Sequence, residues 1–201
     1  MEFSPRVYAR GHRAPLGLKA CRQRNLGRDM EDSDIEALKK RLQTLEDRNA
    51  IVDTLNQYGQ ALDYGDFDRL VDVFTRDAIR ETKRLDGSVN RWEGEAGTID
   101  FARRHSHAPD LYHKHLAFNP RVQIDGDTAE VVSYMFRFDP RDGEPSFIWG
   151  MGRYLDKLRR EADGKWRITH RISEIEDQWP GRFALKGGPG SIPASDPVSA
   201  Q

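Results

Sequence analysis

The stretch QYGQALDYGDFDRLVDVF (residues 57–74) joins two amphipathic helical patterns at a short polar break. Gly65 is typical of the position just after a helix, and Asp66 is typical of the N-cap of the next one. The stretch therefore predicts a long helix followed by a second helix. The last turns of the first helix carry Tyr58 and Asp63. A carboxylate there is at the end where the helix dipole favours cations.

The apolar positions define the extent of both helices. Ser33 or Asp34 is suited to cap the first, whose stripe consists of Ile35, Leu38, Leu42, Leu45, Ile51, Leu55, Tyr58 and Leu62. Its first four members have coiled-coil-like spacing. The second helix should bury Phe67, Leu70, Val71 and Phe74 and end at Asp77.

After this point the apolar period changes to two, which indicates strands. Residues 79–85 and 88–93 flank an Asp-Gly turn, and residues 95–106 favour a short helix. Four longer strands are predicted at 111–124, 128–138, 146–160 and 165–178. Helices first and strands after predict an α+β fold, a curved antiparallel sheet covered by about three N-terminal helices. Such a sheet leaves room for a ligand cavity.

Composition limits the classes of function. The chain has 201 residues, 37% hydrophobic and 32% charged, with a net charge of −1. Basic residues gather in residues 1–29, so the remainder is acidic and a poor match for nucleic acid. No apolar run reaches the roughly 18 residues of a membrane span. A single cysteine, Cys21, excludes an intrachain disulfide. We expect a cytoplasmic protein.

The two ends differ in composition from the middle. Residues 1–29 are Arg-rich and lack a sustained period, which favours a disordered basic extension over a transit peptide or an upstream start. Residues 181–201 are rich in Gly, Pro and Ser and should be a flexible tail. One domain is expected over residues 30–180.

Alternation along two strands identifies candidate cavity residues. In the strand at 111–124, one face carries His113, His115, Ala117 and Asn119. In the last strand, Thr169, Arg171, Ser173 and Ile175 form a face too polar for a core, whereas Trp166, Ile168, His170 and Ile172 form an apolar packing face. His115 and Arg171 are therefore candidates for a pocket, and His170 is interpreted as a core histidine.

Asp63 flanks the apolar stripe of its helix, so it either points into the cavity rim or is a solvated helix end. An Asp–His pair makes a general base, because the carboxylate fixes the imidazole tautomer. Arginine supplies a positive charge for a developing anion, and the Tyr58 hydroxyl could donate to a substrate oxygen. Reactions that begin by removing a proton from carbon suit this set and require no cofactor.

A metal site is a weaker interpretation. His105, His107, His113 and His115 lie within eleven residues, and an HxH pair on a strand can chelate a metal. The first two fall at a helix end or loop, and no cysteine or HExxH pattern completes a site. We therefore expect neither a metal nor another cofactor.

Three segments carry a family resemblance. RNAIVDTLNQYGQALDYGDFDRLVDVFTRDA (48–78), HLAFNPRVQIDGDTAEVVSY (115–134) and DGKWRITHRISEIEDQW (163–179) resemble the SnoaL-like branch of the NTF2-like superfamily, a cone-shaped α+β fold. Within that superfamily, scytalone dehydratase, bile-acid dehydratase and hexachlorocyclohexane dehydrochlorinase use an Asp–His dyad. The resemblance places the dyad on Asp63 and His115, the accompanying tyrosine on Tyr58 and a pocket arginine on Arg171.

The resemblance implies a cofactor-independent lyase of dehydratase or dehydrohalogenase type, acting on a small hydrophobic ring substrate. Two alternatives stay open. One is a non-catalytic ligand-binding or structural subunit, and the other is an enzyme similar to ketosteroid isomerase or polyketide cyclase. A homo-oligomer, trimer or dimer, is also expected.

Overall fold

The structure of the chain is a computed structural model that describes residues 32–141 and 143–178. The predictions for residues 1–29 and 181–201 lie outside the described residues. Among the helices described, none is long and apolar enough to cross a membrane.

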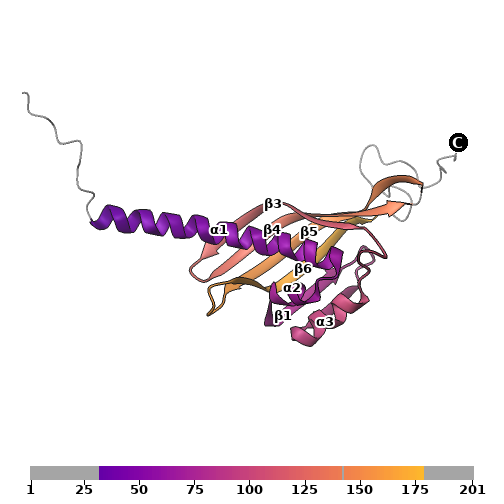
Figure 1. The fold of residues 1–201 in the computed structure, drawn as a ribbon, viewed down its shortest axis with the longest axis horizontal. Coiled ribbons are helices and arrows are strands. Elements are labelled where there is room, and N and C mark those ends of the chain that lie inside the picture. Colours follow the sequence, from indigo (N-terminus) through magenta and orange to yellow (C-terminus); the bar gives the residue numbers. More distant parts are fainter. Residues whose placement is uncertain (1–31, 142, 179–201) are drawn as a thin grey trace, which may run out of the picture.

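The first helix, α1 (Asp32–Tyr64), runs without interruption through the predicted apolar stripe. Gly65 ends it with a φ of +67°, a conformation that favours glycine. Residues 32–46 are exposed, and burial begins at Asp47. Figure 1 shows the corresponding arrangement, in which the first part of α1 projects beyond the sheet and the second part lies across it.

The second helix, α2 (Phe67–Asp72), is capped by Asp66, whose side chain accepts a hydrogen bond from the Arg69 amide. The prediction that it continues to Asp77 was wrong. Strand β1 (Phe74–Lys83) begins directly after it, because Phe74 pairs with Ile168 on the last strand. A long-range sheet contact therefore overrides the local helical period.

Six strands form one open sheet. After β1 come β2 (Val89–Glu93), helix α3 (Gly94–Arg104), β3 (Lys114–Asp125), β4 (Thr128–Arg141), β5 (Glu144–Arg160) and β6 (Trp166–Gln178). The order across the sheet is β2-β1-β6-β5-β4-β3. Only the β1–β6 pair is parallel, since the two strands are distant in sequence and the others are neighbours joined by hairpins. The α+β prediction is confirmed.

Helices α1 and α3 cover one face of the sheet, with α1 against β3 and β6 and α3 against β1 and β2. The core between them includes Ile51, Leu55 and Leu62 of α1 and Ile168 of β6. Asp47, where the buried half of α1 begins, holds the helix against the sheet, because its carboxylate accepts hydrogen bonds from Arg160 at 2.7 Å and the Trp166 indole at 3.1 Å.

Strand β6 changes faces along its length. The β5–β6 pairing shifts by one residue near Thr169, between the Leu158–Ile168 and Lys157–His170 partners. Because side chains alternate, the shift moves the later residues to the other face. The buried set is Trp166, Ile168, Arg171, Ser173 and Ile175.

The prediction that Trp166, Ile168, His170 and Ile172 share one apolar packing face was therefore wrong. The register shift places Trp166 and Ile168 on the opposite face from His170 and Ile172. His170 is not a core histidine either. Its side chain is 28% exposed, and its Nε2 lies 3.1 Å from a Glu81 carboxylate oxygen.

Candidate functional site

A cavity of about 210 Å³ lies between the sheet and helices α1 and α3. Half of the residues of its wall are aromatic or apolar: Tyr58, Trp92, Phe101, Met135, Trp149, Tyr154 and Ile175. The polar residues of the wall are Arg80, Thr82, Arg84, His105, His115, Arg137 and Ser173. An apolar hollow with a few convergent polar groups is the usual form of a small-molecule site.

Asp63 and His115 form a close pair at this cavity. Asp63 Oδ1 lies 2.6 Å from His115 Nδ1. Asp63 is 3% exposed and the His115 side chain 8% exposed, so little water competes for the contact. Because a carboxylate only accepts, His115 Nδ1 donates, and Nε2 keeps its lone pair. His115 lines the cavity, while Asp63 lies behind it.

Backbone geometry fixes this pair. The amide of His115 also donates to the Asp63 carboxylate, at 3.0 Å to Oδ2 and 3.2 Å to Oδ1. Helix α1 approaches β3 so closely that a Cβ on Gly59 would lie 2.5 Å from the His115 carbonyl oxygen. Glycine at position 59 therefore allows the last turns of α1 to hold Asp63 against the strand.

Burial sets the protonation of the site. It raises the pKa of Asp63, opposed by the hydrogen bond from the His115 amide. It also lowers the pKa of His115 well below its ordinary value, so the imidazole is neutral at neutral pH. A neutral imidazole with its lone pair free is the form that accepts a proton.

Tyr58 and Arg80 form a second polar pair on the wall. Arg80 Nη2 donates to the Tyr58 hydroxyl at 2.8 Å, and both residues are buried. The guanidinium lies on the Phe101 ring at 3.3 Å from its centroid and near the Trp92 ring at 5.4 Å. Among the described residues, no carboxylate lies within ion-pair distance of Arg80. The faces of these aromatic rings stabilise the positive charge of Arg80, and this charge remains able to attract an anion.

Arg171 is fully buried but is not part of the cavity wall. Its Nε and Nη2 donate to the two carboxylate oxygens of Asp156, at 2.7 and 2.8 Å. Its guanidinium lies 4.0 Å from the Tyr58 ring centroid and 4.4 Å from that of Tyr154. Burial disfavours its charge, but Asp156 more than compensates and raises the pKa of Arg171. Arg171 thus stabilises the positions of the Tyr58 and Tyr154 rings.

Two further histidines adjoin the dyad. His113 is 0% exposed, and neither of its ring nitrogens has a hydrogen-bond partner. A buried polar group without a partner typically costs about 1–3 kcal/mol. His105 contacts both His113 and His115. Burial lowers the pKa of His113 to about 3 and that of His105 to about 4. These three imidazoles are the residues of the site suited to hold a metal.

The sequence identified part of this arrangement. Of the four residues selected, the structure brings Asp63, His115 and Tyr58 together, whereas Arg171 lies one layer away from the cavity. Arg80 was missed, since a single arginine within a strand carries no distinguishing pattern. His105 had been noticed only as a member of a histidine-rich segment.

Comparison with solved structures defines the fold class. The chain is similar to an NTF2-like protein with a cystatin-like fold from Novosphingobium aromaticivorans, with 23% identity, a TM-score of 0.63, and coverage of 75% of this chain and 93% of that one. It is also similar to Rv3472 of Mycobacterium tuberculosis, a protein of unknown function (24%, TM-score 0.55, coverage 74% and 78%). A third similar structure is hexachlorocyclohexane dehydrochlorinase LinA-type3 of Novosphingobium barchaimii (18%, TM-score 0.56, coverage 72% and 97%).

These similarities, with the open sheet and its helix-covered cavity, define an NTF2-like α+β protein. The SnoaL-like domain family matches residues 43–172, and the chain belongs to this family. A search of curated proteins finds no match.

Proposed function

We propose that this chain is a cofactor-independent lyase, of dehydratase or dehydrohalogenase type, with His115 as the general base. The observation that carries the proposal is the 2.6 Å contact of Asp63 Oδ1 with His115 Nδ1, on a histidine that lines an aromatic cavity. The contact engages Nδ1 and leaves the Nε2 lone pair of His115 free to accept a proton.

In this reaction, His115 Nε2 takes a proton from a substrate carbon. The electron pair of the broken C–H bond forms a C=C bond, and the neighbouring C–X bond breaks to release hydroxide or halide. Asp63 stabilises the imidazolium that forms and keeps its orientation. The Tyr58 hydroxyl donates a hydrogen bond to the substrate oxygen, and Arg80 offsets the developing negative charge.

Arg171 takes a different role in this proposal from the one expected at first. Because its guanidinium is paired with Asp156 and lies against two rings, it positions Tyr58 and Tyr154. It is a positioning residue, whereas Arg80 lines the cavity together with Arg84 and Arg137.

The wall of the cavity supports a substrate class. A volume of about 210 Å³ surrounded by rings suits a single small hydrophobic ring. The arginines suit a halogen or oxygen substituent. A similar structure is that of a hexachlorocyclohexane dehydrochlorinase, which is consistent with this class.

The experiment is a panel of hydroxylated and halogenated ring compounds, with elimination followed by alkene absorbance and halide release. For a compound that turns over, His115→Ala should lower kcat/KM by roughly 10²- to 10⁴-fold. The control variant His170→Asn changes a histidine outside the cavity and should keep wild-type turnover. Full turnover by His115→Ala would refute the assignment of the base.

The alternative functional hypotheses predict different results in the same panel of compounds. Tight binding of ring compounds without turnover would favour a ligand-binding subunit. Migration of a double bond or ring closure without a leaving group would favour an isomerase or cyclase, which share the dyad.

We also propose that the chain forms a homo-oligomer through the exposed part of α1. Its apolar residues recur at intervals of three and four, the spacing of a coiled-coil seam, and are 37–60% exposed: Ile35, Leu38, Leu42 and Leu45. A second copy supplies the same stripe, so the surface is self-complementary.

Light scattering after size-exclusion chromatography tests the oligomer. Wild type should run as a dimer or trimer, Leu42→Glu as a smaller species, and Lys40→Glu as wild type. A wild-type monomer at micromolar concentration would rule out the coiled-coil contact.

A further inference from the structure

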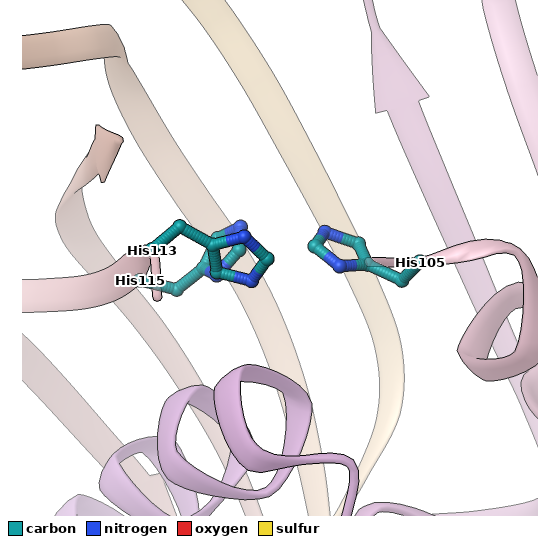
Figure 2. Close-up of side chains that lie close together, drawn as sticks. All are labelled: His105, His113 and His115. Atoms are coloured by element: carbon teal, nitrogen blue, oxygen red, sulfur yellow. The ribbon is translucent and has the colours of Figure 1, made fainter. Parts of the chain in front are cut away.

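Three imidazoles converge beside the cavity from two segments of the chain. His105 follows the end of α3, His113 precedes β3, and His115 lies on β3. Each pair of rings is nearly perpendicular, with centroids 4.9 Å apart. One ring nitrogen from each histidine lies within 4.8 Å of the other two. Figure 2 shows His113 and His115 side by side, with His105 opposite.

Two of these histidines are held as metal-binding histidines usually are. A ligating imidazole normally donates its other N–H to a carboxylate or a backbone carbonyl. His115 Nδ1 donates to Asp63 at 2.6 Å, and His105 Nδ1 donates to the Ser106 carbonyl oxygen at 2.7 Å. Both contacts leave the Nε2 lone pair free and fix the ring orientation.

The third histidine supplies an independent indication. His113 is fully buried and neither ring nitrogen makes a hydrogen bond, although Nε2 lies 3.5 Å from Asp63 Oδ1. Its ring contacts both of the others, and its Nδ1 is buried without a hydrogen bond inside the same cluster. If position 113 served only to fill space, leucine would pack there without burying polar atoms. A buried imidazole lone pair is instead suited to bind a cation.

We propose that His105, His113 and His115 bind one divalent transition-metal ion, with Asp63 as an outer partner of His115. Three imidazoles without a thiolate suit zinc and its neighbours in the first transition row. Because His105 and His115 line the cavity, the open coordination position faces the space where a small molecule would lie.

The dimensions of the cluster are close to those of a metal site. Bonds of 2.0–2.1 Å to each nitrogen place the nitrogens roughly 3.4 Å apart in a tetrahedral site. Small side-chain rotations therefore bring the ligands to that spacing. Asp63 does not compete as a ligand, because its oxygens already accept from the side chain and amide of His115.

This inference goes beyond the proposed function. A metal bound through His115 Nε2 would occupy the lone pair that the base uses, so the lyase proposal applies to the metal-free chain and a bound metal would inhibit it. Metal binding is measured directly, without any substrate, and its failure is therefore distinguishable from the failure of the lyase proposal.

The experiment uses the full chain, free of affinity tags and stripped with a chelator, and titrates it with Co²⁺ as the probe. We expect one Co²⁺ per chain, visible absorption of tetrahedral type, and displacement by Zn²⁺. The absence of binding by the wild-type protein would overturn the proposal.

Variants test the ligands individually. His105→Asn and His113→Asn should abolish the tetrahedral spectrum, and Asp63→Asn should weaken binding by roughly 10- to 100-fold. His170→Asn is the matched control and should bind as wild type. Since His113 is buried, circular dichroism monitors its folding, and His105→Asn carries the test by itself if His113→Asn does not fold. A spectrum that persists in His105→Asn would overturn the assignment.

Discussion

The ion pair of Asp156 and Arg171 is the most buried charge interaction among the described residues. Both side chains are 0% exposed and are joined by two hydrogen bonds of 2.7 and 2.8 Å. The guanidinium also lies against the rings of Tyr58 and Tyr154. Such a pair is costly to bury but even more costly to break, because the remaining charge has no other partner.

Asp156→Asn keeps the shape of the side chain and removes its charge. We expect a loss of about 3–5 kcal/mol in the free energy of unfolding, the range for a broken buried pair. In a domain of this size that corresponds to a decrease in Tm of roughly 10 °C. Double replacement by Asp156→Leu and Arg171→Met should recover most of the loss, since it leaves no unpaired charge.

Urea unfolding followed by tryptophan fluorescence and circular dichroism measures these differences. The control is Glu176→Gln, which removes one of the two carboxylate charges paired with the 43% exposed Arg153 side chain. It should cost less than about 1 kcal/mol. If Asp156→Asn costs no more than the control, the buried pair does not stabilise the fold.

Three further predictions concern α1 and its surroundings. Gly59→Ala should destabilise the fold by about 1–3 kcal/mol despite its higher helix propensity, because the new Cβ would lie 2.5 Å from the His115 carbonyl oxygen; urea unfolding measures the loss. Tyr58→Phe leaves Arg80 Nη2 without its 2.8 Å acceptor and should cost about 1–3 kcal/mol by the same measurement. Asp66→Ala removes the cap of α2 and should cost about 1 kcal/mol, read from the shift in Tm.

Each of these variants has a matched control on an exposed position. Gln60→Ala changes the residue next to Gly59 without a close contact, Tyr134→Phe removes a hydroxyl that is exposed, and Asp53→Ala removes an acid from the middle of α1. All three controls should lie within about 0.5 kcal/mol of wild type. A variant indistinguishable from its control would contradict the contact assigned to it.

Local signals determined most of the secondary structure. The apolar period of α1, Gly65 after it and Asp66 before α2 placed the helix boundary correctly. The Asp-Gly turn likewise placed the hairpin of β1 and β2. These signals are reliable because capping and turn chemistry act within a few residues. The end of α2 was not predictable in this way, since β1 begins where Phe74 pairs with the distant Ile168.

The sequence by itself determined the fold class, the family resemblance and the selection of Asp63 and His115 as partners. Only the tertiary structure decided how the site is arranged around them. A one-residue register shift near Thr169 determines which side chains of β6 are buried. The role of Arg80 depends on the aromatic rings that surround it, which come from other elements. His105 joins His113 and His115 because α3 packs against β1 and β2, which no spacing in the sequence encodes. The periodicity of a sequence specifies which side chains of one helix or strand share a face. A functional site depends on how the faces of several helices and strands pack together.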